Sequence, residues 1–482
     1  MNNRFYITTA IPYVNAKPHI GFALELIQTD AKLRYEREKR GEGDVFGLTG
    51  SDENSLKNVR AAEDAGEDVS EFVARHAEEY KLLKQTLDLS FDDFIRTREE
   101  RHILGAQKLW SACKKEDIYQ KTYTGHYCVG CEQFYTEKEI PDGVCPEHKK
   151  PLEIVEEENY FFRLSNYQEQ LEELIESDTL RIIPETRKNE VLSFIKQGLE
   201  DFSISRSQER AKHWGVNVPG DDSQVMYVWF DALSNYITAL GYAEDSDLYK
   251  KFWVENPNRA HVIGKGISRF HAIYWPAMLL SAGVPLPTEL FVHGYITVEG
   301  AKMSKSIGNV IHPKELVDEY GVDAVRYFFL REIPSHGDGD FSRARMEERY
   351  AELANQLGNL VSRVAAMSIK YFEGALDEAD IDWTKKTAEL DSAAKEYDFK
   401  TYLDGVFQVV AEANDAIDKK APFKLVKEDE AAAKKVLSEL AEQIRFVGRA
   451  LVPIIPQTAK EILERYGKII VKGEALFPRR DQ

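Results

Sequence analysis

The first fifty residues carry two kinds of hydrophobic pattern, in an order that few folds accommodate. Residues 5–10 are mostly aromatic and β-branched, which predicts a buried strand. Residues 21–40 place apolar side chains at helical spacing, and residues 45–50 predict a second strand. A strand, a loop, a helix and a strand in this order begin a doubly wound α/β fold, the Rossmann type with a parallel sheet that binds nucleotides.

The pattern changes along the chain and predicts four segments, since 482 residues exceed what one core usually organises. Residues 1–117 and 226–345 alternate strand and helix signals and form the two halves of one catalytic domain. Residues 118–225 contain short β-like pieces and a cysteine cluster, so they form an insertion between the halves. At the junction, residues 225–229 predict a strand. Residues 346–482 predict an all-α helical bundle.

Composition narrows the function classes without deciding among them. The formal net charge of -19 taken alone argues against a nucleic-acid partner, but acidic helices such as residues 63–79 can carry the excess while a basic strip survives elsewhere. No apolar run is long enough to span a bilayer, and no secretory signal is visible. We therefore expect a cytoplasmic protein with no membrane association.

Two segments far apart in the sequence suit a phosphate group. His19 and Gly21 stand where the first loop enters its helix, and backbone N–H groups at a helix start favour an anion. The second segment combines two lysines with two serines and suits a polyphosphate: Lys302, Met303, Ser304, Lys305 and Ser306. Each segment alone has an ordinary interpretation, an incidental His-Gly pair and a solvated basic turn. Together they predict an ATP site.

A cluster of soft ligands lies in the insertion. Cys128 and Cys131 form one CxxC knuckle, and Cys145 and His148 repeat the spacing after thirteen intervening residues. Four ligands at this spacing suit one closed tetrahedral Zn²⁺ per chain, which is a structural site because no position stays open. The alternative is four free side chains brought together by chance. Cys113 lies outside the cluster and is expected to be a buried helical thiol.

The two phosphate segments resemble the paired motifs of class I aminoacyl-tRNA synthetases. The residues around them resemble the methionyl-tRNA synthetase family over essentially the whole chain, at residues 10–13, 49–53, 227–233 and 263–271. The resemblance implies an aminoacyl-tRNA ligase that activates L-methionine with ATP and Mg²⁺. Methionyl-adenylate and pyrophosphate form, and the methionyl group then passes to the 3′ end of tRNA(Met).

The resemblance also implies which side chains bind methionine: Ala10, Ile11, Tyr13, Asp52, Trp229, Ala232, Leu233, Tyr236, Ile267 and His271. Asp52 would pair with the α-ammonium, and the aromatic residues would form a slot suited to a thioether, with Tyr13 or His271 as a weak donor to sulfur. Spacing alone favours ordinary core packing for Trp229 and Tyr236. The family also has a zinc knuckle at the four cysteine and histidine positions.

In the helical bundle the resemblance implies anticodon recognition by Asn359, Arg363 and Phe423. Asn359 and Arg363 are four residues apart and share a helix face, which spacing alone would assign to solvent. Phe423 stands where the family has a tryptophan, and it can still stack on an unpaired base. The C-terminal dimerisation and tRNA-binding domain of some family members has no counterpart here, so a monomer is expected.

Three positions depart from the family pattern. Phe22 replaces a histidine, Asn54 replaces a histidine after the acidic loop, and Gly266 replaces an aspartate that contacts the ATP ribose. Two alternatives follow. One is a relative that charges another amino acid, although the insertion leaves little room for an editing domain. The other is a catalytically impaired paralogue that retains tRNA or partner binding.

Overall fold

The computed structural model describes residues 3–135, 140, 142–147, 149–303 and 308–478. The chain folds into two compact units. Unit 1 consists of Met1–Pro18, Arg40–Gln85 and Ser90–His293, and unit 2 consists of His19–Lys39, Thr86–Leu89 and Gly294–Gln482. In the part of the chain that the structure describes, no helix combines the length and apolar character needed to cross a membrane.

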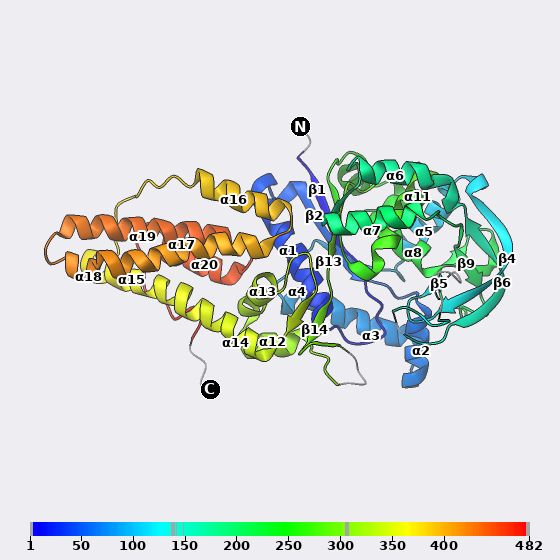
Figure 1. Ribbon diagram of the computed structural model, residues 1–482, viewed down its shortest axis with the longest axis horizontal. Coiled ribbons are helices and arrows are strands. Elements are labelled where there is room, and N and C mark those ends of the chain that lie inside the picture. Colours follow the sequence, from blue (N-terminus) through cyan, green and yellow to red (C-terminus); the bar gives the residue numbers. More distant parts are fainter. Residues whose placement is uncertain (1–2, 136–139, 141, 148, 304–307, 479–482) are drawn as a thin grey trace. The chain divides into compact units, whose positions relative to one another are not determined.

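A six-stranded parallel sheet forms the centre of unit 1 (Figure 1). Its strands, in spatial order, are β3 (Asp93–Arg96), β2 (Val45–Ser51), β1 (Phe5–Thr9), β12 (Arg259–Gly264), β13 (Glu289–His293) and β7 (Arg181–Ile183). Strand β1 is fully buried and pairs on one side with β2 and on the other with β12. The predicted doubly wound fold is confirmed. Because parallel strands end at one edge, the loops after β1, β2 and β12 meet there.

The helices of unit 1 include two, at residues 168–176 and 185–196, in the segment where the sequence predicted only short β-like pieces. The helices of this unit are α2 (Leu56–Ala65), α3 (Val69–Lys81), α5 (Glu100–Ala112), α6 (Gln168–Glu176), α7 (Glu185–Lys196), α8 (Val228–Leu233), α9 (Asn235–Thr238), α10 (Asp247–Tyr249) and α11 (Trp275–Ala282). The short helix α4 (Leu83–Thr86) leads into the Thr86–Leu89 segment of unit 2. Short 3-10 helices are η1 (Glu42–Asp44), η2 (Lys115–Asp117), η3 (Leu164–Tyr167), η4 (Tyr242–Glu244) and η6 (Lys265–Ile267). Short π-helices are η5 (Lys250–Val254), η7 (Phe270–Tyr274) and, in unit 2, η8 (Leu353–Gly358).

The strand predicted over residues 225–229 is wrong in its second half. Strand β11 (Asp221–Met226) ends at Met226, and α8 already begins at Val228. β11 also belongs to a small antiparallel sheet with β9 (Ser205–Ser207) and β10 (Asn217–Val218). A short, continuous apolar run does not distinguish a strand from a buried helix, and here the backbone N–H of Asp231 donates to the carbonyl oxygen of Tyr227 at 3.2 Å, as in a helical turn.

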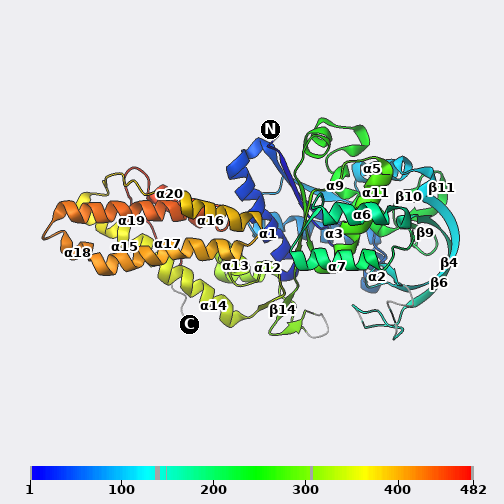
Figure 2. The same ribbon diagram turned by 45° about the horizontal axis from the view of Figure 1, so that its top comes forward.

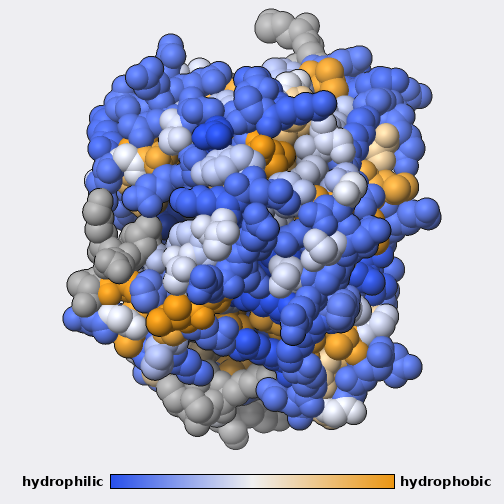
Figure 3. All heavy atoms as spheres, turned by 90° about the vertical axis from the view of Figure 1, so that its right-hand side faces the viewer, coloured by the Kyte–Doolittle hydropathy of each residue, from blue (hydrophilic) through white to orange (hydrophobic). Residues whose placement is uncertain are grey.

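The predicted insertion contains a four-stranded antiparallel sheet in the order β5 (Gln133–Tyr135), β4 (Ile118–Cys128), β6 (Glu153–Phe162) and β8 (Phe202–Ser203). Strands β4 and β6 run side by side over their whole length (Figure 2). The face of unit 1 that they occupy is mainly hydrophilic, with apolar residues in small separate patches (Figure 3). The insertion also supplies β7, the edge strand of the parallel sheet, which three residues were too few to predict.

Unit 2 combines α1 (Ile20–Arg40), whose residues up to Lys39 belong to it, with a small sheet and a helical bundle. In the sheet, β14 (Ile296–Val298) lies between β15 (Ala301–Lys302) and β16 (Gly339–Phe341). The helices are α12 (Pro313–Tyr320), α13 (Val322–Arg331), α14 (Arg343–Glu352), α15 (Asn359–Phe372), α16 (Thr384–Lys395), α17 (Phe399–Lys420), α18 (Pro422–Leu425), α19 (Glu430–Leu451) and α20 (Pro456–Arg465). Figures 1 and 2 both show α15, α17 and α19 side by side, which confirms the predicted bundle.

Buried polar contacts hold α1 within unit 2. Asp30 and Arg326 of α13 are both fully buried and lie 2.8 Å apart. The Arg326 guanidinium also donates to the carbonyl oxygens of Pro453 and Ile454. A buried charge pair is retained only when its remaining hydrogen-bonding groups are satisfied, as they are here. These contacts fix the helix that begins at the first phosphate segment.

Candidate active site

The first phosphate segment caps the start of α1. The backbone N–H of Gly21 donates to Nδ1 of His19 at 3.0 Å. Solvent reaches the ring, yet desolvation by the surrounding chain and then nearby His312 lower the pKa of His19. A neutral ring that accepts at Nδ1 carries its hydrogen on Nε2. His19 is therefore prepared to donate Nε2–H to a ligand oxygen.

Gly21 is required for this arrangement. A methyl group at position 21 would lie 2.8 Å from Cε1 of His19, closer than such atoms approach, and 3.5 Å from Cε of Met303. The backbone N–H of Ile20 also donates to the carbonyl oxygen of Ile311 at 3.1 Å. Unit 2 thus brings Gly21 of the first segment close to Met303 of the second. Ser304, Lys305 and Ser306 lie outside the described residues.

The second segment starts from a firmly anchored hairpin. Lys302 ends β15 with an exposed side chain. The Asp340 carboxylate accepts hydrogen bonds from the backbone N–H of Gly300, at 2.8 Å, and from Oγ1 of Thr297, at 2.6 Å. On the far side, the Asn309 amide donates to the carbonyl oxygen of Lys302 at 3.3 Å. Gly300, Lys302 and Asn309 are therefore held by hydrogen bonds among the described residues.

In unit 1, Asp52 lies at the carboxyl end of the parallel sheet. Its backbone N–H donates to the carbonyl oxygen of Pro12 at 2.9 Å, which forms a bridge between Asp52 and Tyr13. The side chain is buried, and desolvation followed by the Asp231 charge raises its pKa well above the usual range. Among the described residues no cation pairs with it. A buried carboxylate without a counter-charge is costly, so this position suits a cationic group of a ligand.

The other predicted methionine-binding residues lie in the core of unit 1 or pack against it. Trp229 stacks on Phe270 with ring centroids 3.8 Å apart and an interplanar angle of 5°. Nε1 of Trp229 and the hydroxyl of Tyr13 are buried without a hydrogen-bond partner among the described residues. Ala10, Ile11, Trp229 and Ile267 pack partly buried against a core that includes Leu233 and Tyr236, and Ala232 is buried on α8.

His271 is held as a neutral ring with both nitrogens engaged. Its Nδ1–H donates to the carbonyl oxygen of Ile267 at 3.0 Å, so its Nε2 accepts from the Tyr236 hydroxyl at 2.6 Å. Burial lowers its pKa to about 4. In this arrangement both ring nitrogens of His271 are engaged, and its role towards a thioether stays a prediction. The hydroxyl of Tyr13, the other predicted donor, has no hydrogen-bond partner among the described residues.

Asn54, one of the three departures, connects the Asp52 loop to a polar core that sequence analysis missed. Its backbone N–H donates to Oδ1 of Asp52 at 3.1 Å, and its amide donates to Oδ2 of Asp231 at 2.7 Å. Asp231 also accepts from Nε2 of His102 at 2.6 Å. All four side chains are buried. An asparagine at this position thus supports the loop by hydrogen bonds.

The other two departures have simpler surroundings. Gly266 is exposed in η6, directly after β12. Phe22 lies in the first turn of α1, and its backbone N–H donates to the carbonyl oxygen of His19 at 3.1 Å. Neither residue offers a side-chain donor, so His19 and backbone groups are the donors that this helix start presents.

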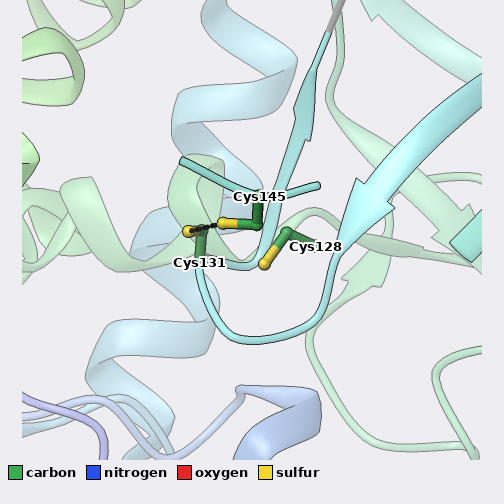
Figure 4. Close-up of side chains that lie close together, drawn as sticks. All are labelled: Cys128, Cys131 and Cys145. Atoms are coloured by element: carbon green, nitrogen blue, oxygen red, sulfur yellow. Dashed lines mark hydrogen bonds between the residues drawn. The ribbon is translucent and has the colours of Figure 1, made fainter. Parts of the chain in front are cut away.

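The three cysteines of the predicted zinc site converge (Figure 4). The sulfur atoms of Cys128, Cys131 and Cys145 lie within 4.8 Å of one another, and those of Cys131 and Cys145 are 3.4 Å apart. Tetrahedral zinc with Zn–S bonds of about 2.3 Å would place its sulfurs about 3.8 Å apart. The three buried or half-buried thiols therefore fit a zinc ion. His148, the predicted fourth ligand, lies outside the described residues.

The predicted anticodon residues lie in unit 2. Asn359 and Arg363 are exposed one turn apart at the start of α15, and Arg363 contacts Asp418 of α17 at 3.0 Å. Phe423 is 41% exposed in α18, which lies at one end of the bundle (Figure 1). Lys424 reaches over the Phe423 ring at 5.8 Å from its centroid. An exposed aromatic ring with a neighbouring cation suits an unpaired base.

The parallel sheet and the two phosphate segments are those of a class I tRNA synthetase, and the family model described as "tRNA synthetases class I (M)" matches residues 5–365. A "Methionine--tRNA ligase" of Brucella suis is 46% identical over 96% of this chain and 91% of its own length. That of Caldanaerobacter subterraneus subsp. tengcongensis is 43% identical over 100% of this chain and 80% of its own.

Solved structures of methionyl-tRNA synthetase are also similar to this chain. Mycobacterium tuberculosis methionyl-tRNA synthetase in complex with methionyl-adenylate matches with a TM-score of 0.92 and 36% identity, over 99% of this chain and 100% of the other. The chain therefore belongs to the methionine–tRNA ligase family.

Proposed function

We propose that this chain activates L-methionine with ATP and transfers the methionyl group to tRNA(Met). The observation that carries the proposal is the buried Asp52 carboxylate at the carboxyl end of the parallel sheet, which has no cation beside it among the described residues. The chain's relatives are methionine–tRNA ligases, which supports the same substrate. Asp52 would pair with the substrate ammonium. No contact in the described residues favours the alternative of an impaired paralogue.

The side chain of methionine would lie against Trp229, Tyr236 and Ile267, with Tyr13 as the donor to sulfur. Methionine is long, unbranched and polarisable, and sulfur–aromatic contacts contribute about 0.3–1.5 kcal/mol each. The Tyr13 hydroxyl is buried and has no hydrogen-bond partner in the described part of the chain, which supports its role. Ala10, Ile11, Ala232 and Leu233 would line the rest of the pocket, and His271 would hold Tyr236 in place.

In the chemical step, a methionine carboxylate oxygen attacks the α-phosphorus of ATP and pyrophosphate leaves. His19 would donate Nε2–H to a phosphate oxygen, and Gly21 would let the backbone approach the nucleotide. Lys302 and Lys305, with Met303, Ser304 and Ser306, would stabilise the charge that grows on the phosphates. Mg²⁺ would accompany ATP as part of the substrate. The second step transfers methionine to the 3′ end of the tRNA.

The remaining roles follow the same family pattern. Asn359 and Arg363 would donate to edges of anticodon bases, and Phe423 would stack on one of them. Cys128, Cys131, Cys145 and His148 would hold one structural Zn²⁺, supported by the convergence of the three sulfurs. The four-segment domain division, a monomeric state and a cytoplasmic location stay predictions.

Exchange of labelled pyrophosphate into ATP tests the activation step. Each of the twenty amino acids is supplied in turn, without tRNA. Exchange with methionine alone is the expected result. Exchange with a different amino acid would show that methionine is not the substrate. No exchange with any amino acid would support the alternative of a catalytically impaired paralogue.

A further inference from the structure

Glu132 directly follows a cysteine of the predicted zinc site, yet it is completely buried. Its Oε1 accepts hydrogen bonds from the Ser55 hydroxyl, at 2.9 Å, and from the backbone N–H of Lys57, at 3.1 Å. Its Oε2 accepts from the Arg206 guanidinium, at 3.2 Å, and from the Tyr127 hydroxyl. Both carboxylate oxygens are thus used by groups from separate parts of unit 1.

The backbone conformation of Glu132 is one that a residue with a side chain rarely adopts. Its φ angle is +54°, in the left-handed region where glycine is favoured and a side chain is strained. The Glu132 carbonyl oxygen also accepts from the Tyr227 hydroxyl. A glutamate at such a turn is retained when its contacts outweigh the conformational cost.

Two of the groups that bind Glu132, at Ser55 and Lys57, lie a few residues after Asp52 in the chain. Ser55 is the N-cap of α2, and its oxygen shares the Lys57 N–H with Glu132. A carboxylate at this helix start is stabilised by the free N–H groups there. One residue earlier, the Asn54 N–H donates to Oδ1 of Asp52. A continuous chain of hydrogen bonds and backbone therefore joins the residue after Cys131 to the Asp52 carboxylate.

We propose that Glu132 is a positioning residue that holds the Asp52 loop in its amino-acid-binding arrangement and so couples the cysteine cluster to methionine recognition. The inference rests on the proposed function, because it assigns Glu132 a role in the same pocket. Glu132 touches no substrate. It acts through Ser55 and the start of α2.

The variant Glu132→Gln tests this role. The amide keeps the size of the side chain, but its NH₂ group must face donors at one of the two oxygen positions, so the loop loses an anchor. We expect the KM for methionine to rise about tenfold in pyrophosphate exchange, with kcat and the KM for ATP changed less than about threefold. Zinc content, measured by atomic emission, should equal that of the wild type.

Glu153→Gln is the matched control, because Glu153 lies in the neighbouring β6 and its only described ion pair is an exposed one with Arg60. It should behave as the wild type. If Glu132→Gln lowers kcat and raises every KM together, or loses zinc, or matches the control, Glu132 has no positioning role.

Ser55→Gly decides the question if Glu132→Gln does not fold. Glycine is tolerated at an N-cap, so the variant removes the hydroxyl bond to Glu132 at small cost to α2. We expect the KM for methionine to rise about threefold with zinc retained, and an unchanged KM would overturn the proposal. Wild-type protein that shows no methionine-dependent exchange would instead refute the proposed function itself.

Discussion

The Tyr236 hydroxyl lies 2.6 Å from Nε2 of His271, and this contact fixes the polarity of both groups. The only ring hydrogen of neutral His271 is donated to the carbonyl oxygen of Ile267. The Tyr236 hydroxyl is therefore the donor in its bond to Nε2 of His271. Both residues are buried, and their rings lie beside that of Trp229 or His261. The rings of Tyr236 and His271 are therefore held by one hydrogen bond with a fixed direction, whereas the Tyr13 hydroxyl has no hydrogen-bond partner among the described residues.

Tyr236→Phe should weaken methionine binding. The change leaves Nε2 of His271 buried without a donor, which costs about 1–3 kcal/mol, or roughly a tenfold rise in the KM for methionine if the pocket bears the loss. Tyr402→Phe is the control, because it removes a similar buried bond to the carbonyl oxygen of Ala450 in unit 2. Both variants should lose stability in urea unfolding. A KM that changes equally in the two would show that the Tyr236 contact serves stability alone.

Much of this arrangement was readable from the sequence because it depends on local patterns. The strand, helix and strand of residues 5–50 required a parallel sheet, and the sheet places the loops of Tyr13 and Asp52 at one edge. Strand β7 gave no signal, because it has three residues and gains its place only by pairing with β13.

Long-range polar contacts were equally invisible. Asp231 binds Asn54, which lies 177 positions earlier, and Glu132 binds Ser55, which lies 77 positions earlier. No periodicity marks such partners, since each depends on the final packing of the chain. Buried polar side chains are therefore the part of the site that only the structure supplies.

Asp52→Asn should abolish the charge that receives the substrate ammonium. We expect kcat/KM for methionine to fall about 100-fold or more, the loss typical when one partner of a buried charge pair is removed. Asp68→Asn is the control, because it alters an exposed N-cap carboxylate that asparagine replaces well. A similar small effect in both variants would contradict the role of Asp52.

The pH dependence of methionine use follows from the raised pKa of Asp52. Only the ionised carboxylate attracts an ammonium, so kcat/KM for methionine should decrease as the pH falls through that raised pKa. Without methionine, the folded state holds a proton that the unfolded state releases, so this group makes stability decrease as the pH rises from 3.8 towards its raised pKa. Added methionine should oppose that decrease, and the acid limb should vanish in Asp52→Asn.

Gly21→Ala should impair ATP use by displacing His19, since the new methyl group would lie 2.8 Å from Cε1 of that ring. We expect kcat/KM for ATP in pyrophosphate exchange to fall about 10- to 100-fold, the effect of losing one phosphate donor. Methionine binding, measured by calorimetry, should stay unchanged. His19→Ala and the double variant complete the test. If Gly21→Ala lowers kcat/KM for ATP by the same factor in the wild type and in His19→Ala, displacement of the His19 ring is not the cause.

Cys128→Ala should remove the zinc and destabilise the insertion. Loss of one of the converging sulfurs leaves too few ligands for a closed site. We expect zinc content near zero and a Tm lower by about 5 °C, as a loss of about 2 kcal/mol would give. Cys113→Ala is the control, because that thiol is buried outside the cluster. Zinc retained in Cys128→Ala, or lost equally in both, would refute the assignment.

Arg363→Ala should separate tRNA recognition from amino-acid activation. The contact of Arg363 with Asp418 is exposed and contributes little to stability, so the variant should fold as the wild type does. Loss of a base-edge donor costs about 1–3 kcal/mol, so the KM for tRNA in aminoacylation should rise roughly tenfold while tRNA-free pyrophosphate exchange stays unchanged. Lys419→Ala is the control, because it removes the same charge from another exposed pair, with Asp415 on α17. If the two variants raise the KM for tRNA by the same factor, Arg363 contributes general charge, because a base-specific contact would make its variant the more damaging.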